Sequence, residues 1–513
     1  MKVGVRGVKA LTKPLSLSVA ALLLLLFSHS ALLFVAAVVV ASAVGLSNLY
    51  RMIRRPETIR LSSAFAVSIL LGYGLGSTIY LASNQTIHAT RYQYWAPQGL
   101  LFNQEGLAIG LAASLLAAAV LYMVATFERP AFTGFGSDSL GSPKAERLVW
   151  LGLAVTVLAL YAGNIGYMGV VVSDPGNAAP LGVIANLMVP PLVPYTLLLI
   201  IDKRPLARRA MLVAALLFLI GVLILVGRRY LLYAAVLSAI ALGMRRGYKF
   251  SKRELAIAVG FSVLAGVVLY WGFNIFMAMR LAAQSEPGGD ASLLELGRAA
   301  LSQLSGAQAS VVRGQLAENI GSRPFILSYL AGLMEISSSR MPAFGAELFY
   351  SLQMVIPSVL MPGKVAALPP SPEYLVHPRY GIPVFDGPNS ALVAGFDDFG
   401  FLGALVYPLG VAVLYGWFNK ALRTVVRDSA IRLFVLFAIL FQLLYIEQAL
   451  ASTFVTLRDL TILVGVAWIL GKLPILRLAR HRSPRSPLPP AERIHPAQLA
   501  LRQDRESTFN DRR

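Results

Sequence analysis

Arginines are the residues of this sequence with the most specific chemistry, and several of them lie in one long segment between two groups of apolar runs. Arg228 and Arg229 form a separate pair between two apolar runs, where charge is costly unless it is used. A guanidinium stays charged and binds anionic groups through paired hydrogen bonds. The sequence therefore predicts an anion-binding site. The long segment, about residues 280–389, carries Arg280, Arg298, Arg313, Arg323, Arg340, Lys364 and Arg379.

Asp397 and Asp398 form an adjacent acidic pair, which could hold a divalent cation. The pair also stands at the start of a predicted helix, where acidic side chains stabilise the N-terminus. We prefer the second interpretation and predict no metal. The chain contains no cysteine, and we find no HExxH motif, nucleophile elbow or Walker A motif.

The composition indicates a membrane protein. Hydrophobic residues make up 57% of the chain and charged residues 14%, with a mean hydropathy of +0.67. Soluble domains carry roughly 25% charged residues. The net charge of +20 falls in short loops and one tail, where membrane topology places it, so we expect no nucleic-acid partner.

Apolar runs near the length that crosses a bilayer predict an all-α polytopic integral membrane protein with about 12 transmembrane helices. The first long run is flanked by basic residues on both sides, which favours a hairpin of two spans turning at Ser28–Ser30. Pro190, Pro191 and Pro194 predict a kink or break in the sixth span. The predicted spans cover about 15–27, 31–46, 61–82, 106–127, 148–172, 181–201, 211–227, 231–244, 255–277, 399–417, 433–446 and 460–476.

The distribution of Lys and Arg places both termini in the cytoplasm. We divide the chain into spans one to nine (1–277), a large extracytoplasmic loop (278–395), spans ten to twelve (396–477) and a disordered basic cytoplasmic tail (478–513). A loop of this length is too long for a simple connector and is expected to carry the function.

Several helices are expected within the loop. Leucines from Leu293 to Leu304 recur at helical spacing, and a second helical stretch covers 311–320. The apolar stretches 325–334 and 344–360 are expected to lie in the membrane interface. The prolines from Pro369 to Pro383 predict an irregular strap around His377 and Arg379.

Three segments resemble the oligosaccharide repeat-unit polymerases, the O-antigen and exopolysaccharide polymerase group. They are GRRYLLYAAVLSAI at 227–240, GAELFYSLQMVIPSVLMPGK at 345–364 and PNSALVAGFDDFGFLGALVYPLG at 388–410. The resemblance extends over about 227–417. The related O-antigen ligases often carry a histidine beside a polar residue ahead of the Gly-x-x-Gly. Here Pro388-Asn389 stands there and the nearest histidine is His377, which favours a polymerase.

The resemblance implies an enzyme that joins oligosaccharide units carried on polyprenyl pyrophosphate at the outer face of the bacterial inner membrane. Arginines would hold the pyrophosphate leaving group, and neither a nucleotide nor another cofactor would be needed. A chain-length regulator and a flippase are the implied protein partners. The catalytic candidates are Arg229, Arg313, His377 and Arg379, and the substrate-binding candidates are Arg228, Arg298, Arg323, Arg340, Lys364 and Asn389.

Three other functions remain open at this point. An O-antigen ligase would use the same donor with a different acceptor. A transporter or flippase of lipid-linked glycan would carry polar residues in the middle of its spans and no large outer domain, which matches this sequence less well. The protein could also be a non-catalytic membrane partner in a polysaccharide export complex. Only the arginines distinguish this function from a polymerase, because a non-catalytic partner would not need them to bind pyrophosphate.

Overall fold

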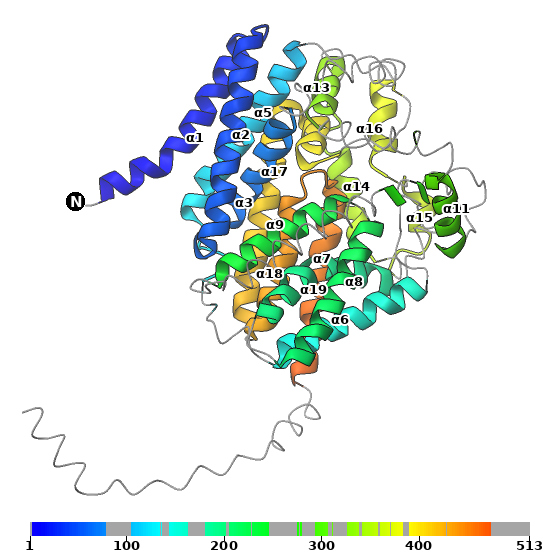
Figure 1. Ribbon diagram of the computed structural model, residues 1–513. Helices are drawn as coiled ribbons and strands as arrows, with labels where there is room; N and C mark the ends of the chain where they lie inside the picture. Colours follow the sequence, from blue (N-terminus) through cyan, green and yellow to red (C-terminus); the bar gives the residue numbers. More distant parts are fainter. Residues whose placement is uncertain are drawn as a thin grey trace, which may run out of the picture. The chain divides into compact units, whose positions relative to one another are not determined.

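A computed structural model describes the chain as an assembly of helices, and the described residues contain no strand (Figure 1). The residues described are 3–77, 104–133, 135, 143–162, 180–201, 205–226, 228–245, 274–275, 278–279, 293–305, 310, 326–337, 341–357, 360–369, 371–382, 389–426 and 428–472. The helical stretch 311–320, the basic tail and all of the predicted ninth span except residues 274–275 lie outside these ranges.

Most predicted spans that fall within the described residues correspond to a helix. The helices before the large loop are α1 (Val3–Leu26), α2 (Ala31–Arg54), α3 (Leu61–Ile69), α5 (Gln104–Phe127), α6 (Pro143–Tyr161), α7 (Pro180–Ile201), α8 (Leu206–Val226) and α9 (Arg228–Met244). Those after it are α17 (Ala391–Val425), α18 (Ser429–Leu444) and α19 (Leu450–Lys472). Residues 1–462 form one compact unit, and α19 continues from it into a second unit that begins at Leu463.

Four of these helices are long and apolar enough to cross a membrane, and several shorter ones are apolar as well. They contain Ala31–Arg54, Glu105–Phe127, Leu206–Ile224 and Ala391–Val425. The chain is therefore an all-helical protein whose apolar helices are consistent with a membrane protein. The number of spans stays a prediction.

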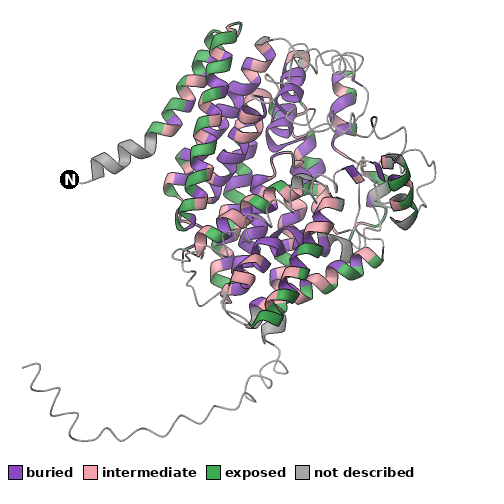
Figure 2. Ribbon diagram, viewed as in Figure 1, coloured by how far each residue is buried: buried purple, intermediate pink, exposed green. Residues whose placement is uncertain are grey.

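The helical hairpin at the N-terminus is present. α1 and α2 are separated by a short turn, and the Ser30 hydroxyl caps α2 by accepting a hydrogen bond from the amide of Leu33. A polar contact ties the pair to α5: the Lys13 ammonium donates to Asn48 Oδ1, and Asn48 Nδ2 donates to the Tyr122 hydroxyl at 2.8 Å. Leucines and valines on the outward sides of α1 and α2 remain exposed (Figure 2).

The helices of the large loop are α11 (Leu293–Ser305), α13 (Ile326–Ser337), α14 (Ala346–Val355), α15 (Lys364–Ala367) and α16 (Glu373–Tyr380). The stretch 325–334, expected in the membrane interface, falls mostly in α13, which is buried and packs on α5, with Leu327 close to Gly110; its place relative to a membrane stays a prediction. Every residue from Ile326 to Met334 is buried, and all but Ser328 are apolar or aromatic, which is typical of a helix enclosed by protein.

The proline strap is also more regular than expected, because Glu373–Tyr380 forms a helix. Pro372 stands at its N-terminal cap, where the missing amide hydrogen costs nothing. Gly381 ends the helix with a left-handed backbone (φ +67°), a conformation that glycine adopts readily. In the sixth span, α7 continues through Pro190, Pro191 and Pro194, so the predicted break is absent.

A break occurs instead within α17, at Phe399 and Gly400. Both residues have non-helical backbone angles, and Gly400 has φ +63° and ψ −148°. The two halves of α17 fold against each other there, because Gly395 and Gly403 meet so closely that a Cβ on either would clash with the other's carbonyl group. Asp397 and Asp398 therefore lie at the tip of a tight helical hairpin.

Candidate functional site

The tip of the α17 hairpin is joined to the start of α14 through the backbone. The amides of Ala343 and Phe344 donate to the carbonyl oxygens of Asp397 and Asp398, at 2.8 and 2.9 Å. Phe344 adopts a left-handed backbone with φ +50°, which is strained for a residue with a large side chain. This tight turn leads directly into α14.

Asp398 caps α14 rather than its own helix. Its two carboxylate oxygens accept hydrogen bonds from the amides of Glu347 and Leu348, both at 2.9 Å, and a third from the Tyr407 hydroxyl at 2.6 Å. The expected helix-stabilising role for this acidic pair is therefore found in Asp398, but on a neighbouring helix. A fully buried carboxylate with three donors is a structural anchor.

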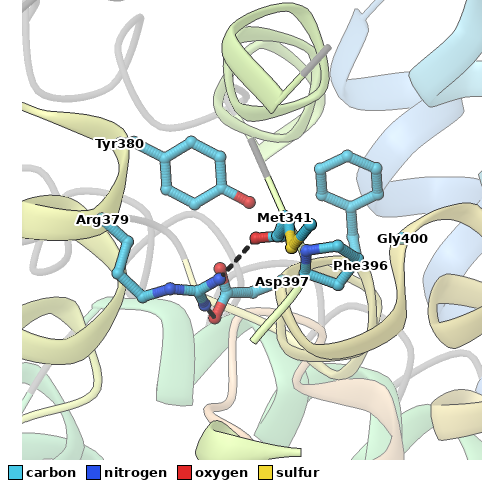
Figure 3. Close-up of a pocket in the computed structure, with 7 residues that line it drawn as sticks. Met341, Arg379, Tyr380, Phe396, Asp397 and Gly400 are labelled. Atoms are coloured by element: carbon cyan, nitrogen blue, oxygen red, sulfur yellow. Dashed lines mark hydrogen bonds and ion pairs between the residues drawn. The ribbon is translucent and has the colours of Figure 1, made fainter. Parts of the chain in front are cut away.

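Asp397 points instead into a pocket of about 390 Å³, where it meets Arg379 (Figure 3). Arg379 Nη1 lies 2.8 Å from Asp397 Oδ2, and Nη2 donates to the Met341 carbonyl oxygen at 2.9 Å. The Arg379 side chain is 33% exposed and that of Asp397 is 2% exposed, so the cation is open to a ligand. The pocket is lined by Met341, Pro342, Arg379, Tyr380, Phe396, Asp397 and Gly400.

The pocket carries both charge and apolar surface. Arg379 has more N–H donors than its two contacts use, so it can still bind an anion. The Tyr380 hydroxyl points toward the ion pair (Figure 3), and burial together with nearby Asp397 raises the pKa of Tyr380 above its usual range. Met341 and Phe344 on the adjoining turn are 80% and 71% exposed. Such a site suits a ligand with an anionic head and an apolar part.

His377 lies behind the pocket instead of lining it. The imidazole is completely buried, and its Nε2 atom is 2.7 Å from the Tyr329 hydroxyl of α13. The two rings meet edge to face with their centroids 5.9 Å apart. His377 thus joins α16 to α13, and a catalytic role for it stays a prediction.

Asn389 belongs to a chain of buried polar groups beside the pocket. Its Nδ2 atom donates to Glu347 Oε1 at 3.2 Å, and its Oδ1 atom accepts from the amide of Ser390 at 2.8 Å. The Ser390 hydroxyl caps α17 and lies 2.8 Å from the Tyr73 hydroxyl. Tyr73 comes from η2 (Leu70–Leu75), a π-helical stretch that continues α3.

Lys364 lies at the opposite end of α14 from Asp398. Its ammonium donates to the carbonyl oxygens of Met354 and Ile356 at 2.7 and 2.8 Å, and Arg458 Nη1 donates to that of Val355 at 3.1 Å. Burial and the charge of Arg458 lower the pKa of Lys364. These cations neutralise the negative end of the helix. Both ends of α14 are thus held by charged side chains.

Of the remaining arginine candidates, only the side chain of Arg298 is described, and it does not line this pocket. Arg298 is exposed on α11. Arg228 and Arg229 begin α9, but only their backbone is described. Arg313, Arg323 and Arg340 lie outside the described residues. Among the sequence candidates, the structure brings Arg379, His377 and Asn389 into one region.

Sequence reasoning did not select the partners of these residues, chiefly Asp397, Glu347 and Tyr380. Asp397 was considered only as a metal ligand or helix cap. The available signal was Gly400 beside two acidic residues, which is typical of a chain reversal carrying polar groups. Within the described part of the chain, no group of three or more His, Asp or Glu residues is arranged to hold a metal ion.

No family model, curated protein or solved structure matches this chain. The functional argument therefore depends on the site and on the sequence patterns alone.

Proposed function

We propose that this protein polymerises oligosaccharide repeat units carried on polyprenyl pyrophosphate, at the outer face of the bacterial inner membrane. The observation that carries the proposal is the Arg379–Asp397 pair in a pocket with an exposed apolar rim. A polyprenyl-pyrophosphate glycan combines an anionic group, a sugar and a hydrocarbon chain. The pocket volume of about 390 Å³ falls within the range of about 300–1,000 Å³ that is typical of ligand pockets.

Each side chain has a separate task in this proposal. An oxygen of the acceptor sugar attacks the anomeric carbon of the donor, and the bond from that carbon to the pyrophosphate breaks. Arg379 stabilises the pyrophosphate as it leaves with the bonding electrons. Asp397 takes the proton from the attacking hydroxyl group. The bond energy is supplied by the donor, so no nucleotide takes part.

The other arginines enter the proposal as predicted ligands of the same donor. Arg229 and Arg313 are proposed to assist in neutralising the pyrophosphate, and the further candidates Arg228, Arg298, Arg323 and Arg340 to contact the glycan or the membrane surface. If the single and double alanine variants of Arg229 and Arg313 still made full-length polymer, these two arginines would have no part in the site.

Reconstitution tests the reaction directly. Purified protein in liposomes would receive polyprenyl-pyrophosphate oligosaccharide in the presence of chelator and without nucleotide, and the products would be separated by size. A ladder of products is expected. Transfer of one unit to an added lipid acceptor would indicate a ligase, and movement of the substrate between leaflets without new bonds would indicate a transporter. Absence of all three outcomes would leave only a non-catalytic role and contradict the proposal.

A further inference from the structure

Glu347 is a buried carboxyl group with an incomplete set of hydrogen bonds. It lies in the first turn of α14 and is 1% exposed. Its Oε1 atom accepts from Asn389, whereas Oε2 has no hydrogen-bond partner among the described residues. A buried carboxylate oxygen without a donor is costly, whereas a protonated one becomes a donor itself.

Asp397 also has one buried carboxylate oxygen with an incomplete set of hydrogen bonds. Its Oδ2 atom is held by Arg379, and the Tyr380 hydroxyl interacts with the same carboxylate, but its Oδ1 atom is buried and has no hydrogen-bond partner of good geometry among the described residues. Of the neighbouring charges, that of Asp397 acts most strongly on Glu347. A protonated Glu347 needs a hydrogen-bond acceptor for its O–H group, and an ionised Asp397 can accept a further hydrogen bond at Oδ1.

Among the described residues, the charged groups that act on Glu347 are carboxylates, and these disfavour a second negative charge at Glu347. Asp397 and Asp398 approach from α17 and Glu373 from α16, and the cation of that helix, Arg379, is paired with Asp397. The amides that begin α14 are already bound to Asp398. His377 and Tyr329 are hydrogen-bonded to each other. Burial and these carboxylates raise the pKa of Glu347 well above its usual range.

We propose that Glu347 is a neutral carboxylic acid that supports Asp397 as the proton acceptor of the reaction. Its O–H group donates to Oδ1 of Asp397, in addition to the interaction from the Tyr380 hydroxyl, and thereby keeps that carboxylate ionised beside Arg379. Glu347 is a positioning residue, since it does not line the pocket. This inference rests on the proposed function for its catalytic consequence, but the protonation of Glu347 can be measured without it.

Infrared spectroscopy of the full-length protein in lipid nanodiscs gives that independent measurement. A protonated carboxyl group has its own C=O stretching band, which should be present at neutral pH and disappear in both Glu347→Gln and Glu347→Ala. Glu57→Gln, which changes an exposed glutamate, is the control and should retain the band. Loss of the band in neither Glu347 variant would show that Glu347 is ionised, and the inference would be overturned.

The two variants also make opposite predictions for transfer. Gln keeps an N–H donor toward Asp397, so Glu347→Gln should remain within about threefold of the wild-type rate at neutral pH. Glu347→Ala has no donor, so its rate should fall by about tenfold or more, and its acidic limb should shift to higher pH. If Glu347→Gln were as inactive as Asp397→Asn, an ionised Glu347 would be required and the inference would be wrong. A protonated Glu347 with no transfer in any protein would refute the proposed function alone.

Discussion

At the scale of single residues, the pocket depends on one guanidinium and one carboxylate that come from different helices. Arg379→Gln should remove most of the stabilisation of an anionic leaving group, and Asp397→Asn should remove the proton acceptor. Each variant is expected to slow transfer by about 100-fold or more. The rates of product formation in liposomes, corrected for the amount of inserted protein, would measure this loss.

The chain contains a matched control for these two variants. Arg458 and Asp459 form a second ion pair with a distance of 2.7 Å, away from the pocket-lining residues. Asp459→Asn removes an equivalent carboxylate that does not line the pocket, and because its partner Arg458 also holds the far end of α14, its transfer should fall much less than that of Asp397→Asn. An equal loss in Asp459→Asn and Asp397→Asn would show that the ion pairs act only through folding.

Glu347 should also affect how stability depends on pH. The folded protein holds the Glu347 proton, whereas the unfolded chain releases it near pH 4.3, the usual value for glutamate. The folded state therefore binds more protons above that pH, and the free energy of unfolding should fall as the pH rises toward the raised pKa. Glu347→Gln should reduce this slope. Denaturation midpoints in detergent, recorded across the pH range, would reveal equal slopes if the prediction is wrong.

At the scale of elements, α14 is the helix that connects the pocket to its surroundings. Asp398 caps its first turn, and Asp428 caps α18 by accepting a hydrogen bond from the amide of Ala430. Asp398→Ala and Asp428→Ala should each lower the free energy of unfolding, by about 1–3 kcal/mol.

Only the first of these caps holds the pocket together. Transfer should therefore fall in Asp398→Ala and remain close to wild type in Asp428→Ala, when both are assayed at a temperature where the proteins are folded. Parallel measurement of thermal midpoints and product ladders would separate stability from activity. Similar transfer rates in the two variants would mean that α14 does not position the site.

The sequence predicts the helices well because lipid burial demands long apolar runs. α2, α5 and α8 follow directly from such runs and their basic flanks. The burial of α13 was not predicted, since the same apolar composition suits both a protein core and a membrane interface.

The pocket itself was predicted only in part. Arg379 could be selected because of its chemistry, but its pairing with Asp397 depends on the reversal at Phe399 and Gly400. That reversal needs the contact between Gly395 and Gly403, which local sequence patterns do not specify. Local sequence patterns favour an exposed glutamate in the first turn of a helix. They do not indicate that Glu347 is buried by a neighbouring segment.

At the scale of the whole molecule, segments that the sequence assigns to the same side of the membrane are in contact. Three segments assigned to the cytoplasmic side meet: the Glu128 carboxylate accepts from the amides of Leu61 and Ser62, and Arg423 donates to the Pro130 and Ala131 carbonyl oxygens. The segments that form the pocket are all assigned to the opposite side. The grouping is the same whichever side of a membrane each cluster faces, so the topology stays a prediction.

Labelling can test the topology because the natural chain has no cysteine. Tyr374→Cys introduces an exposed thiol on α16, and Thr133→Cys introduces one in a predicted cytoplasmic loop. A membrane-impermeant maleimide is expected to label Tyr374→Cys once the outer membrane is permeabilised, and Thr133→Cys only after the inner membrane is opened as well. Reversed accessibility would mean that the pocket faces the cytoplasm.

The hydrogen bonds of α3 and η2 have a consequence for the biosynthesis of the protein. Ser68 donates to the carbonyl oxygen of Leu443, and Tyr73 is bonded to Ser390, so their partners follow 375 and 317 residues later. At about 5–20 residues per second, a ribosome needs on the order of tens of seconds to supply them. During this interval these hydroxyl groups must be satisfied by their own helix, by water or by a chaperone. Nascent chains that end before Ser390 are therefore expected to be recognised by membrane quality control.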